Sequence, residues 1–581
     1  MISRYWSYIK RHWYFFFFGP IFVIFSAIME VTLPKITASL INNGIATGDI
    51  SYIVKQSILM MVIALLTMVS SVLGAIFSVN ASTRFGAGLR KDIFARVQKY
   101  SFANLDHLTT GSLITRITND VAQVQQFVQN LLRMMLRAPT MLIGAMIMAF
   151  QLNLSLAMVL CVVIPLLMIS LILLIRGSLT RYSGMQAQLD LLNTQIGESI
   201  ENERVIKSFA REDFEREKFY AVNDTLYQKS IHALKVMLWI APICTIAINV
   251  ATIATIWIAG RQIMIGNMEM GTLTAFITYL SQILTQVRVM TIVFERWSRA
   301  KASANRIREI FDEELDLTDE KATYAERKVE AGSIEFRDVS FRYFKNRREK
   351  VLNHISFRIE AGQTVGIIGS TGSGKSTLIS LIPRLYDTDE GSVLVDGVDV
   401  KDYSFENLRS GIAVVLQKNM LFSGTVRENL YWGKEDATEE ELDEASKHSQ
   451  SAEFLSSFKD GYETELGQGG INLSGGQKQR LCIARALLRK PKILILDDST
   501  SALDTATDAR FRKALREEAS DITCLIIAQR ISSVMDADRI LVMDNGALVG
   551  NGTHAELMRS CRVYREIYMT QKEGDAANDG R

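Results

Sequence analysis

The sequence predicts a multidomain fold in which an all-α domain of six transmembrane helices precedes an α/β domain built around a phosphate-binding loop. Hydrophobic residues make up 48% of the 581 residues, and the long apolar runs lie in the first half of the chain. Such a content is high for a soluble protein of this length. From about Ser333 onward the pattern changes to short β-rich runs, and Gly369–Ser376 reads GSTGSGKS, which fits the phosphate-loop pattern.

Six apolar segments predict the membrane helices, since a helix needs about 20 apolar residues to cross the ~30 Å hydrocarbon core. Their approximate ranges are Tyr14–Pro34, Ser57–Asn80, Met134–Gln151, Leu154–Ile175, Val236–Ala259 and Gly271–Phe294. The third is the weakest because Arg137 and Pro139 interrupt it and only a tight turn separates it from the fourth. One re-entrant element is the alternative there. The first segment shows no small-residue cleavage site, which favours an anchor helix over a signal peptide.

Lysine and arginine residues beside the apolar segments predict the orientation of the chain. They cluster before the first segment and after the second, so both of these ends are expected in the cytoplasm. The connections near Gly48 and Ile265 are then expected outside. Two inner stretches, residues 82–133 and 177–235, repeat apolar residues at helical spacing and are predicted to extend the membrane helices into the cytoplasm.

Composition also excludes several classes of protein. The chain has 65 Lys and Arg against 63 Asp and Glu, which gives no reason to expect nucleic acid as a partner. Its five cysteines are scattered and predict free thiols rather than disulfides or a zinc site. The expected organisation is a transmembrane domain (1–310), a linker (311–332), the α/β domain (333–570) and a polar, disordered tail (571–581).

The phosphate loop stands in the context that its chemistry requires, with the apolar strand TVGIIGS before it and the helix STLISLI after it. Backbone N–H groups of such a loop form a concave site for phosphates. Lys375 is expected to reach the β- and γ-phosphates, and the Ser376 hydroxyl to ligate Mg²⁺. Asp497 ends the apolar run ILIL and would place a second oxygen on the metal. The predicted ATP-binding residues of the loop are Gly369, Ser370, Thr371, Gly372, Ser373, Gly374, Lys375, Ser376 and Thr377.

The segment LSGGQ, Leu473–Gln477, follows the phosphate loop and precedes the run ILILDD. Together these motifs resemble the ATP-binding cassette (ABC) family, and the resemblance covers nearly the whole chain. It implies a head-to-tail dimer in which each LSGGQ loop binds the partner's ATP. The residues implied in this contact are Ser474, Gly475, Gly476 and Gln477, together with Asp504 of SALD. A glycine turn before a helix is the structural alternative.

The resemblance assigns two further residues. Tyr343, about thirty residues before Lys375, corresponds to the aromatic residue that stacks on adenine, although an isolated Tyr is more often a plain strand residue. Gln417 corresponds to the glutamine that contacts Mg²⁺ or the attacking water. We therefore include Tyr343 among the ATP-binding residues and Gln417 among the metal-binding and catalytic ones.

Two catalytic positions depart from the pattern of active relatives. Asp498 stands where the family has a glutamate that polarises the attacking water, and Gln529 stands where it has a histidine. An aspartate is one methylene shorter, and a displacement of about 1 Å can lower a rate ~10²-fold. A glutamine cannot take up the charge that an imidazole can. Both changes are expected to weaken hydrolysis without abolishing phosphate binding.

The resemblance therefore implies a subunit of an ATP-driven exporter in a bacterial cell membrane, with its ATP domain in the cytoplasm. The expected partner is a second half-transporter that carries the missing glutamate and histidine; a homodimer is the alternative. Amphipathic drug-like compounds are the leading substrate class, with lipid or peptide export, or an ATP-gated regulatory role, as alternatives. Helical turns near Phe102–Leu113 and Ile206–Phe214 are expected to contact the ATP domains. Gln282, Gln286 and Arg288 are candidates for the wall of the substrate cavity, although the position of Arg288 near the inner end favours a side chain that snorkels or pairs there.

Overall fold

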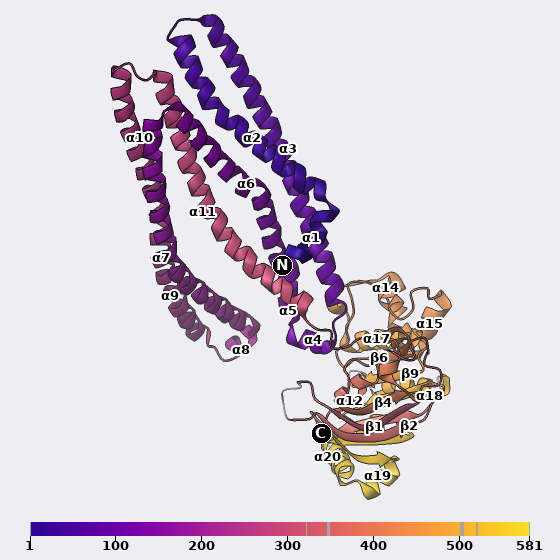
Figure 1. The fold of residues 1–581 in the computed structure, drawn as a ribbon. Helices are drawn as coiled ribbons and strands as arrows, with labels where there is room; N and C mark the ends of the chain where they lie inside the picture. Colours follow the sequence, from indigo (N-terminus) through magenta and orange to yellow (C-terminus); the bar gives the residue numbers. More distant parts are fainter. Residues whose placement is uncertain (1, 321, 345–348, 500–504, 519–520, 580–581) are drawn as a thin grey trace. The chain divides into compact units, whose positions relative to one another are not determined.

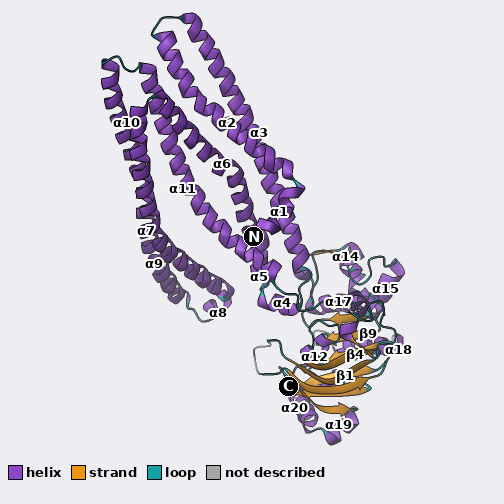
Figure 2. Cartoon of the chain, in the orientation of Figure 1, coloured by secondary structure: helices purple, strands orange, loops and turns teal. Residues whose placement is uncertain are grey.

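The computed structural model describes residues 2–320, 322–344, 349–499, 505–518 and 521–579 (Figure 1). The chain forms two compact units. One comprises Met1–Gln98 and Thr110–Asp312, and the other comprises Lys99–Thr109 and Glu313–Arg581. In Figure 2 the first unit contains helices, whereas the strands lie in the second. This organisation confirms the predicted fold class.

Long helices build the first unit. They are α1 (Ile2–Arg11), α2 (Trp13–Leu40), α3 (Ile50–Val97), α5 (Thr110–Thr115), α6 (Val121–Leu152), α7 (Leu154–Glu201), α8 (Glu203–Ser208), α9 (Glu212–Leu238), α10 (Ile240–Met264) and α11 (Met270–Asp312). Two single π-helical turns, η1 (Ile41–Ile45) and η2 (Arg116–Asp120), extend α2 and join α5 to α6. The inner stretches predicted from the periodicity are accordingly continuous with the apolar helices.

Five helical segments of the described residues are long and apolar enough to cross a membrane: Trp13–Ile45, Ile50–Val97, Thr110–Leu152, Leu154–Leu174 and Pro242–Met264. They overlap the first five predicted segments. The sixth falls within α11, in which the side chains of Arg288 and several residues after it lie outside the described part. The third and fourth segments are separate helices rather than one re-entrant element. Asn153 joins them, and its Oδ1 accepts a hydrogen bond from the N–H of Leu156 at 3.1 Å, which caps α7.

Small residues and a few polar contacts hold the helices of the first unit together. A methyl group on Gly74 of α3 would lie only 2.8 Å from Cγ2 of Val23 on α2, so glycine permits the close approach of these two helices. Tyr279 of α11 is fully buried and donates a hydrogen bond of 2.8 Å to the carbonyl oxygen of Val31. Arg137 of α6 forms an ion pair with Glu30 of α2. The contacts of Tyr279 and Arg137 satisfy polar groups that lipid could not solvate.

The second unit is an α/β domain with two main sheets. The strands are β1 (Ile334–Phe341), β2 (Leu352–Ile359), β3 (Thr364–Gly369), β4 (Glu390–Val395), β5 (Val398–Asp399), β6 (Ile412–Val415), β7 (Gly424–Thr425), β8 (Glu465–Leu466), β9 (Ile493–Asp497), β10 (Thr523–Ile527), β11 (Arg539–Asp544) and β12 (Ala547–Gly552). The helices are α4 (Phe102–His107), α12 (Lys375–Leu381), α13 (Phe405–Ser410), α14 (Val426–Tyr431), α15 (Glu439–His448), α16 (Ala452–Leu455), α17 (Gly475–Leu488), α18 (Thr505–Glu518), α19 (His554–Ser560) and α20 (Arg562–Asp579).

The larger sheet has the strand order β12-β11-β3-β10-β9-β6, and all of its neighbours are parallel except β12 and β11. Every residue of β9 and β10 is buried, as expected for central strands covered on both faces. The smaller sheet, β2-β1-β4-β5, is antiparallel. The apolar runs that the sequence shows after Ser333 therefore become the core of this unit.

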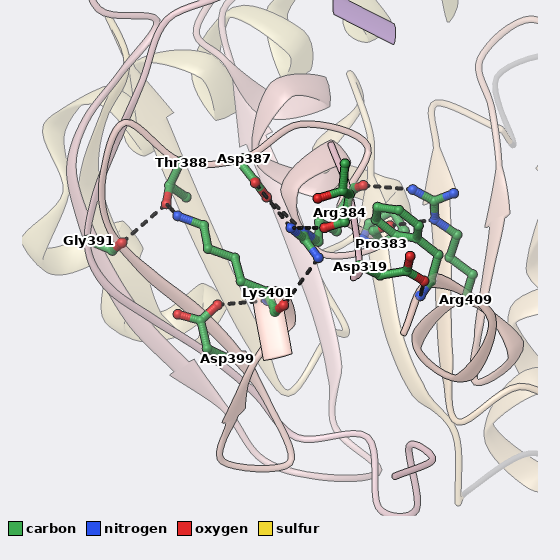
Figure 3. A network of polar contacts seen from close by, with 11 residues as sticks. Asp319, Pro383, Arg384, Asp387, Thr388, Gly391, Asp399, Lys401 and Arg409 are labelled. Atoms are coloured by element: carbon green, nitrogen blue, oxygen red, sulfur yellow. Dashed lines mark hydrogen bonds and ion pairs between the residues drawn. The ribbon is translucent and has the colours of Figure 1, made fainter. Parts of the chain in front are cut away.

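A polar network fastens the predicted linker to the second unit (Figure 3). Arg384, whose side chain is nearly fully buried, pairs with Asp387 at 2.9 Å and donates a hydrogen bond of 3.1 Å to the carbonyl oxygen of Thr318. Asp319 accepts a hydrogen bond of 3.1 Å from the N–H of Phe405. The Arg409 guanidinium donates to the carbonyl oxygen of Arg384 at 2.8 Å. The segment after α11 is thus held by specific contacts.

The end of the chain differs from the expectation of a disordered tail from residue 571 onward. Helix α20 continues to Asp579. Gln571 anchors the middle of α20, because its side-chain oxygen accepts a hydrogen bond of 2.9 Å from the N–H of Ile531. A tertiary contact of this kind cannot be recognised from the polar composition of the tail.

Candidate nucleotide site

The register of four parallel strands brings the residues of the candidate site to one edge of the sheet. Ile527 of β10 lies opposite Asp497 of β9 and opposite Ile367 of β3, and Val415 of β6 lies opposite Leu496 of β9. The carboxyl ends of these four strands therefore meet at one edge of the sheet. In open parallel sheets ligands bind at this edge. The phosphate loop, Asp498, Gln529 and Gln417 all follow these strands, within two residues of their ends.

The phosphate loop has the backbone geometry that its glycines predict. Gly374 has φ of 95° and directly precedes α12. A Cβ there would lie 2.8 Å from Cδ2 of Leu352 and 3.0 Å from the carbonyl oxygen of Val351. Both the left-handed backbone and the close packing thus require glycine. Without a side chain at this position, the loop can curl over the end of β3.

Lys375 folds back over the loop that precedes it. Its Nζ donates hydrogen bonds to the carbonyl oxygens of Gly369 at 2.9 Å and Ser370 at 2.8 Å. Burial lowers the pKa of Lys375, and the charges of Asp497 and Asp498 oppose that shift. An ammonium group held inside a loop of backbone N–H groups is suited to binding phosphate.

Ser376 and Asp497 form the candidate metal pair. The Ser376 hydroxyl donates a hydrogen bond of 3.1 Å to Oδ1 of Asp497, which is 7% exposed. Burial raises the pKa of Asp497, while this hydrogen bond and Lys375 act against the shift. Among the described residues there is no group of three His, Cys, Asp or Glu side chains that could hold a metal. Two oxygens fit Mg²⁺, which usually takes one or two protein ligands and completes its shell with phosphate and water.

Asp498 is where the predicted catalytic residues meet. Its Oδ2 accepts hydrogen bonds from the Gln529 amide at 2.7 Å and from the Gln417 amide at 3.4 Å. Its backbone has φ of 48°, and its N–H donates to the carbonyl oxygen of Ile527 at 3.0 Å. Burial raises the pKa of Asp498, whereas the two amides and Lys375 lower it. The structure therefore brings all three residues named from the sequence together.

The sequence did not point to Gln571, which supports this arrangement from α20. Its amide donates a hydrogen bond of 2.7 Å to the carbonyl oxygen of Gln529, while its side-chain oxygen accepts from the N–H of Ile531. One side chain thus fixes the backbone on both sides of Arg530. No signal in the sequence marks this residue, because it lies 42 positions from Gln529 in a polar segment.

Tyr343 also reaches the phosphate-loop helix. Its hydroxyl forms a hydrogen bond of 2.8 Å with the hydroxyl of Thr377, and its ring packs edge-on against Phe341 and Tyr386 at centroid distances of 5.0 and 5.2 Å. The side chain is 38% exposed, so part of the ring remains open for a ligand. The predicted aromatic residue and the predicted loop are therefore neighbours.

The LSGGQ segment forms the N-terminus of helix α17. Ser474 caps α17, because its hydroxyl accepts from the N–H of Gln477 at 3.3 Å while the Gln477 side chain accepts from the N–H of Ser474 at 2.9 Å. Ser474 and Gly475 are exposed. No hydrogen bond within the described part of the chain links this segment to the phosphate loop. Asp504, the other residue expected to serve a partner's ATP, lies outside the described residues.

Helix α4 provides a contact that the sequence indicated only by its approximate position. Its Asp106 accepts a hydrogen bond of 3.2 Å from the Tyr386 hydroxyl, and the Phe102 ring lies 6.1 Å from the Tyr386 ring. Tyr386 follows α12 by five residues, so it connects α4 to the segment after the phosphate-loop helix. Burial first, and the Asp106 charge second, raise the pKa of Tyr386. Tyr386 itself was not predicted.

Comparison with known proteins assigns both units. The family model described as "ABC transporter transmembrane region" matches residues 16–287, and the family model described as "ABC transporter" matches residues 352–501. The uncharacterised ABC transporter ATP-binding protein YfiB of Bacillus subtilis is 37% identical over 94% of both chains. The ATP-dependent lipid A-core flippase of Desulfotalea psychrophila is 36% identical over 83% of this chain and 84% of its own length.

Two further relatives extend the comparison. The putative multidrug export ATP-binding/permease protein YgaD of Bacillus subtilis is 36% identical over 83% of both chains. Among solved structures, a bacterial Atm1-family ABC exporter with ATP bound matches with a TM-score of 0.82 and 25% identity over 97% of this chain and 99% of that one. The two units and their motifs agree with these similarities along nearly the whole chain. The protein belongs to the ABC transporter family, as a half-transporter that joins one transmembrane region to one ATP-binding domain.

Proposed function

We propose that the chain is one half of a heterodimeric ATP-driven exporter, in which its own ATP site is slow and its LSGGQ segment completes the fast site of the partner. The observation that carries this proposal is the arrangement at Asp498, whose Oδ2 is held by the amides of Gln529 and Gln417. A carboxylate that already accepts two amide hydrogens has less capacity to take a proton from water. The site therefore favours retention of ATP over hydrolysis.

The residues that would hold ATP and Mg²⁺ fit this role. Lys375 and the loop N–H groups would bind the phosphates, Ser376 and Asp497 would ligate Mg²⁺, and Tyr343 would stack on adenine. Bound Mg²⁺ would neutralise charge on the phosphates. Lys375 and Ser376 both match the phosphate-loop pattern. Binding and hydrolysis can thus be separated at this site, since only the groups around Asp498 are altered.

Asp498 and Gln529 supply the reason for slow turnover. The aspartate side chain is one methylene shorter than glutamate, so its oxygen stops roughly 1 Å short of the place a glutamate would reach. The Gln529 amide donates to that oxygen and has no group that accepts a proton near neutral pH. Water placed near the γ-phosphate would therefore meet a weak base.

The exposed LSGGQ segment supports the second half of the proposal. Ser474 and Gly475 are accessible and are pre-positioned by the cap on α17. They would offer a hydroxyl and N–H groups to the phosphates of a partner's ATP. A chain that served only as an ATP-gated regulatory subunit would have no need for this trans contact. We therefore favour the exporter over the regulatory alternative.

The helical connections suggest how the two halves would be coupled. Helix α4 lies within the ATP-binding unit of its own chain, where Asp106 accepts a hydrogen bond from Tyr386. The turn around α8 instead exposes apolar side chains, with Val205 53% and Phe209 72% exposed. Exposed apolar side chains at such a turn fit a contact with the partner chain. Helix α4 would then respond to the ATP-binding unit of its own chain, and the turn around α8 to that of the partner. Both ATP sites would lie in the cytoplasm of a bacterial cell.

The substrate class follows the relatives named for multidrug export and for lipid A-core flipping. We propose an amphipathic substrate, and we favour drug-like compounds over lipids. The buried Oε1 of Gln282 has no hydrogen-bond partner among the described residues, so it could accept a hydrogen bond from a polar group of a bound substrate. Transport assays with amphipathic dyes and with labelled lipids distinguish these two classes.

The test is the ATP turnover of the purified full chain in lipid, measured beside a nucleotide-binding control. We expect bound ATP with negligible turnover. The double variant Asp498→Glu/Gln529→His should then raise turnover at least ~10-fold, since it restores both the reach of the base and an imidazole. Lys375→Ala added to the double variant is the matched control and should abolish the gain. Rapid turnover by the unaltered chain alone would overturn the slow-site proposal and favour a homodimer.

A further inference from the structure

A basic pocket lies where the chain enters its first apolar span. It has a volume of about 330 Å³ and is formed by the second half of α1, by His12 between α1 and α2, and by the C-terminal part of α3. Its lining residues are Tyr8, Arg11, His12, Arg84, Ala87, Gly88, Lys91 and Asp92. The pocket belongs wholly to the transmembrane unit and has no part in the nucleotide site.

Positive charge dominates this pocket. Arg11, Arg84 and Lys91 face one carboxylate, that of Asp92, which accepts a hydrogen bond of 2.6 Å from the Tyr8 hydroxyl. Within the described part of the chain, none of the three cations has a carboxylate within ion-pair distance. The Arg84 guanidinium instead lies over the Phe15 ring, 5.2 Å from its centroid. The cluster therefore leaves an excess of positive charge that an anion can neutralise.

His12 lies in the same positive potential. Burial lowers the pKa of His12, and the positive charges of Arg84 and Arg11 lower it further. A second proton on the imidazole is disfavoured because it would add another cation beside those two. An anion bound in the pocket would offset these positive charges and favour protonation of His12.

Packing of α1 against α3 gives the pocket a fixed wall. Tyr5 and Tyr8 pack against the buried Phe85 ring at centroid distances of 5.8 and 5.6 Å. A Cβ at Gly88 would lie 3.1 Å from Cδ1 of Tyr8, so glycine lets the tyrosine lie close to α3. Arg84 and Lys91 on α3 and Arg11 at the end of α1 therefore line one cavity.

The pocket stands at the N-terminal end of the first apolar span, where lipid headgroups would lie. The apolar span begins at Trp13, directly after His12. Trp6 and Trp13 beside the pocket are 57% and 58% exposed. Exposed tryptophans are enriched at the interface between lipid and water, where the ring is apolar and its N–H is polar. A headgroup phosphate would be at the same level as Arg11, Arg84 and Lys91.

We propose that this pocket binds the phosphate of an anionic ligand, with an anionic phospholipid headgroup as the main source. Basic pockets between membrane helices on the cytoplasmic side are suited to such headgroups. Arginine can bind phosphate oxygens in a bidentate manner, and lysine adds a point charge. The bound lipid would join α1 to α3 and stabilise the start of the transmembrane unit.

The experiment measures lipid retained by the full-length chain by native mass spectrometry, after incubation with phosphatidylglycerol or phosphatidylcholine. We expect more phosphatidylglycerol than phosphatidylcholine on the unaltered chain. The variant Arg11→Gln/Lys91→Gln should lower phosphatidylglycerol binding roughly tenfold or more. The matched control Lys10→Gln/Lys301→Gln loses the same charge from exposed residues outside the pocket and should bind as the unaltered chain does.

Inorganic phosphate added as competitor distinguishes the two sources. If millimolar phosphate displaces the lipid, the pocket also takes free phosphate; if it does not, the headgroup alone is the ligand, and both results support the site. Equal binding of the two lipids by the unaltered chain, or equal loss in both variants, would overturn the proposal. ATP binding and thermal unfolding verify that each variant is folded. If the double variant Arg11→Gln/Lys91→Gln does not fold, the single variant Lys91→Gln takes its place, because Lys91 is exposed.

Discussion

The amide of Gln529 donates a hydrogen bond of 2.7 Å to Oδ2 of Asp498, although the two residues lie 31 positions apart in the chain. These are the two positions at which the resemblance to the family implies departures from active relatives, and their side chains contact each other in the structure. The short carboxylate is held by an amide that donates but does not accept a proton. We therefore expect slow hydrolysis to be a property of the pair rather than of either residue alone.

Removing the carboxylate should prolong the retention of ATP. Asp498→Ala leaves Lys375, Ser376 and Asp497 in place, so the dissociation constant for ATP should change little, while the residual turnover should fall roughly 10²-fold. Single-turnover measurement of bound nucleotide over time checks this. An unchanged rate of ATP loss would show that Asp498 has no part in hydrolysis.

Gln571→Ala should loosen the loop that carries Gln529. The variant removes one hydrogen bond to the carbonyl oxygen of Gln529 and one from the N–H of Ile531, each worth about 1 kcal/mol. We expect a lower free energy of unfolding for the ATP-binding unit, measured by denaturant titration. The neighbouring exposed Lys572→Ala is the control and should have no effect. Equal stability of the two variants would refute the anchoring role of Gln571.

Gly374→Ala should abolish nucleotide binding. The residue has φ of 95°, and a Cβ would contact Leu352 and Val351. Strain of this backbone costs about 1–3 kcal/mol, and the contact adds to it. Gly372→Ala is the matched control, because φ there is 83° but a Cβ added at that position would have no atom within 4 Å. Fluorescent ATP titration should show a larger loss for Gly374→Ala; equal losses would mean that backbone strain alone matters.

The ring and the hydroxyl of Tyr343 should have separable effects. Tyr343→Ala removes the surface for adenine and should weaken ATP binding by about 1–3 kcal/mol, the usual value for stacking of a base on an aromatic ring. Tyr343→Phe keeps the ring and loses only the hydrogen bond to Thr377, so it should bind nearly as the unaltered chain does. Calorimetric titration with ATP and with inorganic triphosphate checks the assignment. A loss of triphosphate affinity equal to that of ATP would place Tyr343 at the phosphates instead.

The transmembrane unit offers a test of its own at Arg306 of α11 and Asp120 at the end of η2. Arg306 Nε donates to Oδ2 of Asp120 at 2.8 Å, and the Asp120 side chain is only 3% exposed. Arg306→Ala leaves this carboxylate buried without its cation, which typically costs about 3–5 kcal/mol. Thermal unfolding in detergent should show a large destabilisation. Asp120→Ala added to Arg306→Ala should recover part of it, and a further loss in the double variant would contradict the pairing.

The sequence alone was sufficient to predict the architecture and the binding loop. Apolar segments of membrane-spanning length predicted the helices, and the run ending in Asp497 predicted a buried strand beside the phosphate loop. These features are local, because a long apolar helix or a glycine loop must adopt much the same form wherever it stands. Asp498 and Gln529 were recognised in the same way, as single positions within motifs.

Only the tertiary structure showed which of these side chains contact one another. Gln417 is 81 residues from Asp498, and Gln571 is 42 residues from Gln529. Gln417 meets Asp498 because β6 lies beside β9 in the sheet, whereas Gln571 reaches Gln529 from helix α20. The basic pocket likewise requires α1 to pack against α3 through Tyr8 and Gly88. Side-chain contacts of this range depend on strand order, register and helix packing, which no local pattern encodes.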